Sequence, residues 1–432
     1  MPAAPNFQSE FLRTFTARGA YYDCSSPEDL DTLFGKARVT AYIGFDCTAK
    51  SMHVGNLVQL MTLRRLQQAG HKPILLMGGG TTKAGDPSGK DETRLILTPA
   101  QIEENKQSML GGVRHLLRFG DGVSDAIMVD NADWLDKLDY IPFLRDVGRH
   151  FSVNRMLTMD SVKLRLEREQ PLSFLEFNYS IMQAYDFVEL NKRFGCRLQS
   201  SGSDQWGNVV SGIELGRRMQ TEQLFGLTTP LITTSSGAKM GKTAAGAVWL
   251  NQDMMSVYDY WQFWRNSEDG DVGRFLRLFT DLAEDEIARL EKLQGAELND
   301  AKKVLADKTT AILHGREAAI TARNAAESAF ERGIISSDLP IKFADRISEE
   351  EKFIDNGDGK WLVSRSAGAI LVASELAKTK SEARNKIKDG GVRINDRVIR
   401  DAKEFISWTE VDSKTGAFKV QLGKKIVLVK PR

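Results

Sequence analysis

The sequence predicts an α/β protein in which a parallel-sheet domain with an inserted helical piece is followed by a helical domain and a small α+β domain. Short apolar runs alternate with amphipathic segments from about residue 39 to residue 226. This alternation is typical of a parallel sheet with crossover helices. Helical spacing then dominates from about residue 230 to residue 330, and the final segment combines two short helices with a hairpin pattern.

The elements of the predicted sheet follow one another along the first half of the chain. The run VTAYIGFD (39–46) predicts a strand, and LVQLMTLRRLQQAG (57–70) predicts a helix that stops at its last glycine. KPILLMGGG (72–80) predicts a second strand with a glycine turn, and AIMVDNADW (126–134) a third. The insertion PFLRDVGRHFSVNRMLTMD (142–160) holds more apolar residues than one thin piece can bury, so we expect a partner subunit to cover them.

Composition places the expected domain boundaries. Prolines, serines and acids gather after the helical segment and predict a linker. Further on, a stop at Gly390-Gly391 ends the second short helix, and a turn at Asn395-Asp396 predicts a hairpin. The expected divisions are a sheet-containing domain over 1–230, a helical domain over 231–330, a linker over 331–358 and a basic domain over 359–432.

The charges are distributed unevenly. The formal net charge of +1 combines a segment from Gly359 onward, with 17 basic and 8 acidic residues, and a remainder with 42 basic and 50 acidic residues. A basic domain on an acidic body indicates a polyanionic partner for the tail. The alternative is a basic domain without a partner.

Overall composition excludes other classes of protein. Hydrophobic residues make up 41% and charged residues 27%, and no apolar run approaches the roughly 20 residues of a membrane helix. The N-terminus lacks the pattern of a signal peptide. Cys24, Cys47 and Cys196 form no CxxC pair and lie near no histidine at zinc spacing, so we expect a reduced, cytoplasmic compartment and no metal site. Cys47 or Cys196 as a nucleophile has no neighbouring base to support it.

A glycine-rich run, MGGGTTKAGDPSGK, follows the second strand. Gly80 and Gly85 have the spacing of a phosphate loop, but Asp86-Pro87 stands where Lys-Ser/Thr is required, and the dinucleotide pattern fails as well. Ligands of open α/β sheets gather at the carboxyl ends of the strands. Asp86 is therefore a candidate to bind an ammonium group, although it would equally serve to brace the turn.

Two other stretches are candidates for anion binding. In SMHVGN a helix begins near Gly55, and helix N-termini expose unpaired N–H groups, to which Thr48 and His53 can add donors. In SSGAKMGKTAAG, Lys239 and Lys242 provide two ammonium groups on a flexible loop, which suit a phosphate chain. Taken alone, each stretch is also compatible with a plain turn or a solvated loop.

Together these stretches resemble the HIGH and KMSKS signatures of class I aminoacyl-tRNA synthetases. The runs YIGFDCTAKSMHVGNL, GDPSGKDETR, FNYSIMQAYDF, SGSDQWGN and KMGKTAAGAVWL are similar to those of bacterial tyrosyl-tRNA synthetases. The resemblance extends from about Phe11 to the C-terminus, and the tail resembles an RNA-binding module shared with a small-subunit ribosomal protein. It implies a Rossmann-like catalytic domain, a helical anticodon-side domain and a C-terminal RNA-binding domain.

The resemblance implies a ligase reaction in two steps. L-Tyrosine and ATP, accompanied by Mg²⁺, would give tyrosyl-adenylate and pyrophosphate, and the tyrosyl group would then pass to the 3′ end of tRNA(Tyr). In-line attack on the α-phosphorus needs alignment and stabilising charge rather than a tuned acid or base. The resemblance also implies a cytoplasmic homodimer with no tightly bound cofactor and with neither DNA nor a membrane as partner.

Site residues can be assigned one by one. Tyr179, Gln183 and Asp186 are spaced i, i+4 and i+7 on one helix face, which is either a core network or the wall of a pocket. The resemblance implies a pocket for tyrosine, with the phenol held by Asp186 and Tyr42. The tyrosine-binding residues would be Tyr42, Asp86, Tyr179, Gln183, Asp186 and Gln205. The catalytic residues would be Thr48, His53, Asn56, Lys239, Lys242 and Thr243. The ATP-binding residues would be Gly44, Asp46, Thr48, His53, Gly55, Gly202, Asp204, Met240 and Lys242. The tRNA-binding residues would be Lys380, Arg384, Lys388, Arg393 and Arg397.

The sequence departs from the family pattern at four positions. Asn56 stands where the second histidine of HIGH is usual, so it can still donate a hydrogen bond but cannot carry charge. Gly241 replaces the first serine of KMSKS, and Cys47 and Lys50 stand in place of a proline and an acid. These changes bear on rate and ATP affinity rather than on the type of reaction.

Three other hypotheses remain. A tryptophanyl-tRNA synthetase would share the fold, but the Tyr42–Asp186 pair argues against an indole pocket. An adenylyltransferase with a similar histidine turn would not need the helical and RNA-type domains. A non-catalytic RNA-binding relative would not need His53, Lys239 and Lys242.

Overall fold

The computed structural model describes residues 5–87, 96–235, 237, 240–243, 246–331, 341–344, 351–355, 361–407, 410–412, 415–423 and 425–431. The chain divides into two compact units. The first comprises Met1–Met255 and Asn266–Leu313, and the second comprises Ser256–Arg265 and His314–Arg432.

The first unit is built around a six-stranded sheet with the order β1-β6-β5-β2-β3-β4. All neighbouring strands are parallel except β1, which is antiparallel to β6. The strands are β1 (Asp23–Cys24), β2 (Thr40–Phe45), β3 (Lys72–Met77), β4 (Ile127–Asp130), β5 (Cys196–Gly202) and β6 (Phe225–Thr229). The predicted parallel sheet is therefore confirmed.

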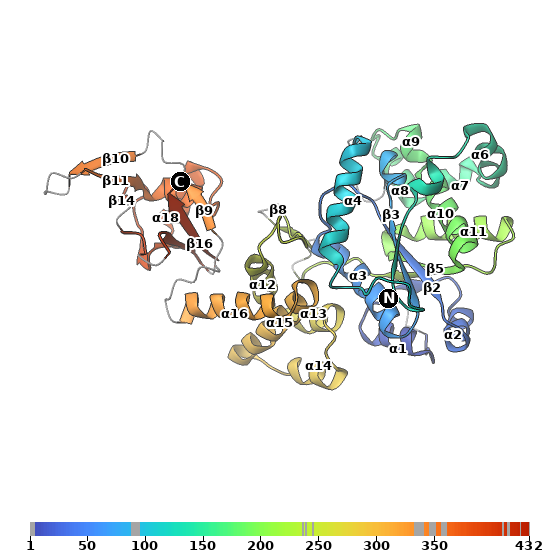
Figure 1. The fold of residues 1–432 in the computed structure, drawn as a ribbon, viewed down its shortest axis with the longest axis horizontal. Helices are drawn as coiled ribbons and strands as arrows, with labels where there is room; N and C mark the ends of the chain where they lie inside the picture. The colour runs from blue at the N-terminus through green and yellow to red at the C-terminus, as the bar shows by residue number, and fades with distance from the viewer. Residues whose placement is uncertain are drawn as a thin grey trace. The chain divides into compact units, whose positions relative to one another are not determined.

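Helices cover both faces of this sheet, with α3 and α4 on one side and α10 and α11 on the other (Figure 1). Strands β2 and β3 are near-continuous apolar runs because both of their faces are buried. The helix α3 ends as predicted before Gly70, whose φ of +82° suits glycine. The helices of this part are α1 (Glu10–Ala17), α2 (Pro27–Lys36), α3 (Val54–Gln68), α4 (Pro99–Val113), α10 (Tyr179–Phe194) and α11 (Trp206–Arg218).

The inserted helical piece lies between β4 and β5, as predicted. Apolar side chains of the predicted segment 142–160 stay exposed: the exposed fraction is 58% for Val153 and 39% for Leu157. The insertion contains α5 (Ala132–Leu135), α6 (Tyr140–Asp146), α7 (Val153–Leu157), α8 (Asp160–Glu167) and α9 (Phe174–Phe177). The partner subunit expected to cover these side chains stays a prediction.

The predicted helical segment is also present. Helices α13 (Val272–Phe279) and α14 (Glu284–Leu290) belong to the first unit, with nearly all of α15 (Leu298–His314). Helices α12 (Val257–Arg265) and α16 (Arg316–Glu331) belong to the second unit. Within the described part of the chain, no helix combines the length and the apolar character that crossing a membrane requires.

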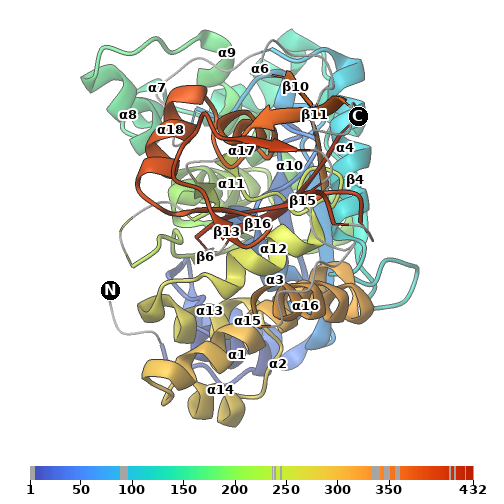
Figure 2. The same cartoon turned by 90° about the vertical axis from the view of Figure 1, so that its left-hand side faces the viewer.

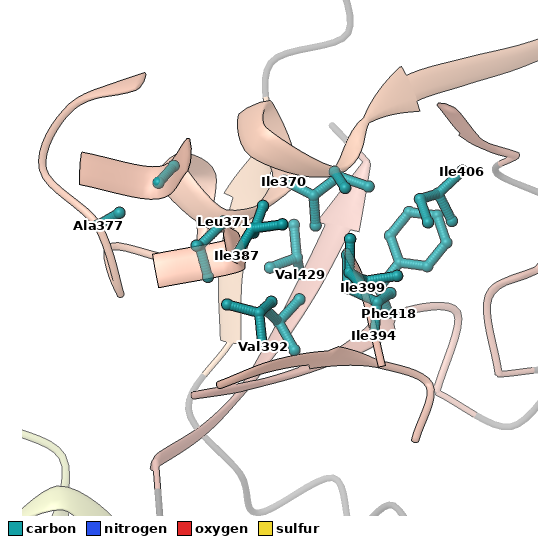
Figure 3. Close-up of a cluster of buried hydrophobic side chains, with 13 residues drawn as sticks. Ile370, Leu371, Ala377, Ile387, Val392, Ile394, Ile399, Ile406, Phe418 and Val429 are labelled. Atoms are coloured by element: carbon teal, nitrogen blue, oxygen red, sulfur yellow. The ribbon is translucent and has the colours of Figure 1, made fainter. Parts of the chain in front are cut away.

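The C-terminal part is an α+β fold, as predicted, with strand orders β13-β12-β15-β16-β9 and β10-β11-β14. Helices α17 and α18 pack on one side of the larger sheet (Figure 2). Ile370, Leu371 and Ile387 from these helices meet Val392 and Val429 from the strands (Figure 3). The elements are β9 (Ile341–Ala344), β10 (Glu351–Asp355), β11 (Trp361–Ser366), α17 (Ala367–Ala373), α18 (Lys380–Lys388), β12 (Val392–Ile394), β13 (Arg397–Val398), β14 (Phe405–Ser407), β15 (Phe418–Leu422) and β16 (Lys425–Pro431).

The glycine stop and the Asn-Asp turn predicted for this part both adopt backbone conformations with positive φ. Gly390 ends α18 with a φ of +74°. Asn395 and Asp396 join β12 to β13 with φ values of +48° and +65°, the conformation of a tight hairpin turn. Two strands, β9 and β10, lie within the segment that composition predicts as a linker, and they pair with β16 and β11.

Candidate active site

The candidate site lies at the carboxyl ends of the parallel strands. The order of the strands reverses between β2 and β5, which is where ligands of open α/β sheets bind. Asp46 follows β2, the short 3₁₀ helix η1 (Thr81–Lys83) follows β3, Asn131 follows β4, and η3 (Ser203–Gln205) follows β5. The topology therefore gathers polar residues that are far apart in the sequence.

Asp186 forms the buried end of the site. Its side chain is 2% exposed, Oδ1 accepts a hydrogen bond from Trp134 Nε1 at 2.7 Å, and Oδ2 accepts one from Asn131 Nδ2 at 2.9 Å. Burial raises the pKa of Asp186 to about 8, although both donors favour the charged form and lower it. A carboxylate has lone pairs for a further donor, so Asp186 can still accept from a ligand.

Tyr42 lies beside Asp186 with an unsatisfied hydroxyl. Its side chain is 1% exposed, packs edge-on against Phe187, and has no hydrogen-bond partner for its hydroxyl among the described residues. Burial, and then the charge of Asp186, raise the pKa of Tyr42 well above its usual value. Because leaving a buried hydroxyl unpaired is costly, this position suits a ligand that supplies the partner.

Two carboxylates form the other end of the site. Tyr179 donates to Asp46 Oδ2 at 3.1 Å, and Thr81 Oγ1 donates to Asp46 Oδ1 at 2.8 Å. Gln205 Nε2 donates to Asp86 Oδ2 at 2.9 Å. Burial, followed by the charges of Asp46 and Asp86, raises the pKa of Tyr179 well above its usual value. The paired negative charges favour a cation, such as an ammonium group, between them.

The polar residues predicted to share one helix face do lie on a single helix, at the predicted spacing. Tyr179, Gln183 and Asp186 all lie on α10, where Tyr179 and Asp186 are buried and Gln183 is half-buried. Asp46 contributes its side chain to this region, where it accepts hydrogen bonds from Tyr179 and Thr81. The ligand-binding roles of these residues stay predictions.

The start of α3 explains the asparagine of SMHVGN. His53 is the N-cap residue, and Asn56 Oδ1 accepts from the backbone N–H of His53 at 3.1 Å. Asn56 thus completes the helix start by accepting a hydrogen bond from the chain. Asparagine can fill this role because the role needs an acceptor and no charge, whereas the sequence suggested that Asn56 would donate.

The two signature stretches contact each other directly. The Val54 N–H donates to the Val248 carbonyl and the Leu250 N–H to the Met52 carbonyl, both at 2.9 Å. His53 also pairs with Trp249 in an isolated antiparallel bridge. The HVGN turn and the chain that follows KMGKT therefore form one connected structure, although sequence spacing alone does not reveal it.

Glycine is required on both sides of this contact. Gly241 has a φ of +85°, and a side chain there would approach the Gly55 nitrogen at 3.0 Å. A side chain on Gly55 would lie 2.7 Å from the His53 ring and 3.2 Å from the Met240 carbonyl. Gly241 is thereby explained as a left-handed position, and Gly55 makes room for the His53 ring and for the second loop.

Other predicted residues occupy several environments. Thr48 and Asp204 are exposed, Gly44 is exposed at the end of β2, and Gly202 lies against Asp204. Met240 is 5% exposed. Lys239 lies outside the described residues. Lys242 and Thr243 form the short strand β7 (Lys242–Thr243), which pairs with β8 (Gly246–Ala247), and only their backbone is described.

The structure adds residues that sequence analysis missed. Asn131 and Trp134 hold Asp186, and Thr81 holds Asp46. Asn251 links the two signature stretches, accepting from Ser51 Oγ at 3.0 Å. The polar NADW after the third strand was a usable signal, because strand carboxyl ends converge, whereas nothing in the sequence marked Asn251.

The predicted RNA-binding residues lie on the C-terminal part. Lys380, Arg384 and Lys388 are exposed on α18, and Arg393 and Arg397 are exposed on the β12–β13 hairpin. Arg397 forms an ion pair with the carboxylate of Glu404, which lies on the segment after the hairpin.

No group of three or more histidine, cysteine, aspartate or glutamate side chains lies at metal-binding geometry in the part of the chain that the structure describes.

Comparisons define the class of protein. Residues 35–331 match the family described as tRNA synthetases class I (W and Y), and residues 369–407 match the S4 domain. The chain therefore belongs to the class I aminoacyl-tRNA synthetases and carries an S4 domain.

Individual relatives narrow this class. The tyrosine–tRNA ligase of Rhodopseudomonas palustris is 58% identical over 97% of both chains, and that of a Caulobacter species is 57% identical over the whole of both. The C-terminally truncated mitochondrial tyrosyl-tRNA synthetase of Aspergillus nidulans superposes with a TM-score of 0.68 at 30% identity, covering 75% of this chain and 95% of that one. Within its class, the chain belongs to the tyrosine–tRNA ligase family.

Proposed function

We propose that this chain activates L-tyrosine with ATP and transfers the tyrosyl group to the 3′ end of tRNA(Tyr), using the site residues assigned above. The observation that carries the proposal is that two buried groups lie near each other, the Asp186 carboxyl group and the Tyr42 hydroxyl, and that this hydroxyl has no hydrogen-bond partner among the described residues. A phenol would donate to Asp186 and accept from Tyr42. At the other end, Asp86 and Tyr179 would receive the ammonium group, with Gln183 and Gln205 completing the pocket.

This arrangement would select tyrosine over phenylalanine. Phenylalanine would leave the Asp186 carboxylate and the Tyr42 hydroxyl buried without their ligand partner. A preference of about 10⁵-fold is known for a tyrosyl-tRNA synthetase, and we adopt that magnitude for this chain.

The nucleotide would lie along the joined signature stretches. Thr48, His53 and Asn56 would act from the start of α3, where helix N–H groups favour phosphates. The second loop would contribute Lys239, Lys242, Thr243 and Met240. The two lysines would place positive charge where the negative charge of the leaving pyrophosphate develops. The rest of ATP would be lined by Gly44, Asp46, Gly55, Gly202 and Asp204. ATP would enter with Mg²⁺ on its phosphates, and the enzyme would use no tightly bound cofactor.

The tRNA would meet the helical segment and the basic C-terminal domain. Arg384, Lys388, Lys380, Arg393 and Arg397 would contact its phosphates through shape more than sequence. The exposed apolar side chains of the insertion support a homodimer, since patches of this kind mark interaction sites. We place this dimer in the cytoplasm, with neither DNA nor a membrane as partner.

The test is amino-acid-dependent exchange of label between pyrophosphate and ATP, followed by charging of tRNA(Tyr). Tyrosine should support exchange, while phenylalanine and tryptophan should not, and charging should require the same tyrosine. Exchange with tryptophan alone would overturn the assignment. Binding of tRNA with no exchange under any amino acid would instead favour a non-catalytic RNA-binding role.

A further inference from the structure

The start of the second signature loop is fixed to the helical segment. The backbone N–H of Ser235 donates to Asp271 Oδ2 at 2.9 Å, and Arg274 Nη2 donates to Asp271 Oδ1 at 2.8 Å. The same Arg274 nitrogen donates to the Thr233 carbonyl, and Ser235 Oγ donates to Glu268. The residues just before the lysines are therefore held by the short 3₁₀ helix η4 (Asp269–Asp271) and by α13.

Asp271 is a charged side chain with an exposed fraction of 2%. Both of its oxygens are used, one by the loop and one by Arg274. Hydrogen bonds that an ionised group makes are stronger than neutral ones, and removing one partner of a buried ion pair is costly. The position of Ser235, four residues before Lys239, is thus held by a strong and directional contact.

The other end of α13 is held by α3. Arg65 Nη2 donates to the carbonyls of Arg277 and Leu278, both at 2.8 Å, where α13 ends. Arg65 is 5% exposed, and burial lowers its pKa to about 10, which leaves it charged at neutral pH. A cation at the C-terminus of a helix also interacts favourably with the helix dipole.

These contacts connect the second loop to α3 by two routes. The end of the loop reaches the start of α3 through the backbone bond between Val54 and Val248. The start of the loop reaches the far end of α3 through Asp271, α13 and Arg65. Because His53 caps α3, the same helix carries one signature and anchors the other.

We propose that Asp271 and Arg274 are positioning residues for adenylate formation, which set the start of the second loop so that Lys239 and Lys242 reach the phosphates of ATP. The proposal rests on the function proposed above, in which these lysines act on ATP. Neither Asp271 nor Arg274 touches a substrate; each acts through the loop backbone.

The test uses the full-length enzyme with Asp271→Asn and Arg274→Gln. Asp271→Asn keeps the shape but removes the charge, and Arg274→Gln changes a side chain that is 42% exposed and keeps an amide that can still donate to Asp271. In pyrophosphate exchange, we expect kcat/KM for ATP to fall by about 10- to 100-fold, while KM for tyrosine changes less than about twofold. Arg274→Lys should recover part of the loss.

A second readout is the rate at which trypsin cleaves the native protein after Lys239 or Lys242. A loosened loop start should raise this rate about tenfold over the wild type. The matched control is Leu290→Ala on α14, which opens a cavity in the same helical segment without touching the loop. Its effect on kcat/KM for ATP and on loop cleavage should be small.

The outcomes separate this inference from the proposed function. Lys242→Ala should abolish activation; normal exchange by that variant would refute the role of the loop in the proposed function. If Lys242→Ala is inactive while Asp271→Asn and Arg274→Gln behave like the wild type, the positioning role is refuted and the proposed function stands. The inference would also be overturned if Asp271→Asn and Arg274→Gln impaired the use of ATP and of tyrosine equally, or if Leu290→Ala had effects as large as theirs. Either result would mean that Asp271 has only a structural role.

Discussion

Polar residues have opposite environments in the proposed tyrosine pocket and on the basic surface of the C-terminal domain. In the pocket, Asp186 is buried and held by two donors, and the Tyr42 hydroxyl is buried without a partner among the described residues. On the C-terminal domain, Arg384 and Lys388 project from a helix whose other face packs on a small apolar core. Buried polar groups reject any ligand that leaves them unpaired, whereas exposed cations bind phosphates without burial and add small increments.

The largest expected effect is at Asp186. Replacing it with alanine should reduce the preference for tyrosine over phenylalanine by about 10³-fold or more, because the acceptor for the phenol is lost. The measurement is the ratio of kcat/KM for the two amino acids in pyrophosphate exchange, with KM for ATP as an internal control. Asp253→Asn, at an exposed position, should leave the ratio unchanged. A preserved preference in Asp186→Ala would contradict the role of the carboxylate.

The same carboxyl group should make stability depend on pH. Its pKa lies at about 8 in the folded protein against an ordinary value of 3.8. Protonation therefore stabilises the folded protein fully below about pH 4, and this stabilisation is lost as the pH rises toward 8. Relative to Asp186→Asn, the wild type should lose about 1 kcal/mol of unfolding free energy per pH unit in this window. Denaturant unfolding of both proteins between about pH 5 and pH 8 provides the comparison, and parallel curves would be evidence against it.

A smaller effect is expected at Trp134, which sequence analysis missed. Trp134→Phe keeps an aromatic ring but removes the Nε1–H that donates to Asp186 at 2.7 Å. We expect KM for tyrosine to rise about tenfold, since Asp186 loses a buried hydrogen bond that fixes its orientation toward the phenol, while KM for ATP stays constant. Arg193 lies over the same ring, and Arg193→Gln, which leaves the donor in place, should change KM for tyrosine less.

The smallest effects are expected on the basic surface. Arg384→Gln should weaken tRNA binding about threefold and lower the slope of log K against log salt by about one unit, as loss of one phosphate contact does. Arg397 forms an ion pair with Glu404, so Arg397→Gln should change both quantities less. Binding measured across a range of salt concentrations tests both variants. An effect of Arg384→Gln on tyrosine selection would break the contrast between the two regions.

Sequence patterns predict the fold because the apolar residues of a strand or a helix recur in the sequence in a way that is typical of that element. The apolar runs of β2 and β3 and the glycines at 70 and 390 are local signals, and the structure places their elements as expected. Partners brought together by the fold are not readable in this way. Asn131, Trp134 and Asp271 act through side chains or backbone groups far along the chain. The departures at Asn56 and Gly241 also became interpretable only through a capping bond and a left-handed backbone.

Tyr42→Phe tests the central claim most directly, because it removes only a hydroxyl that has no partner among the described residues. The ligand-free variant should be at least as stable as the wild type, since a buried unpaired group is lost. Its affinity for tyrosine, measured by calorimetry, should fall about fivefold, and its preference over phenylalanine should fall with it. A destabilised free protein with unchanged tyrosine affinity would show that the hydroxyl belongs to the core and not to a tyrosine site.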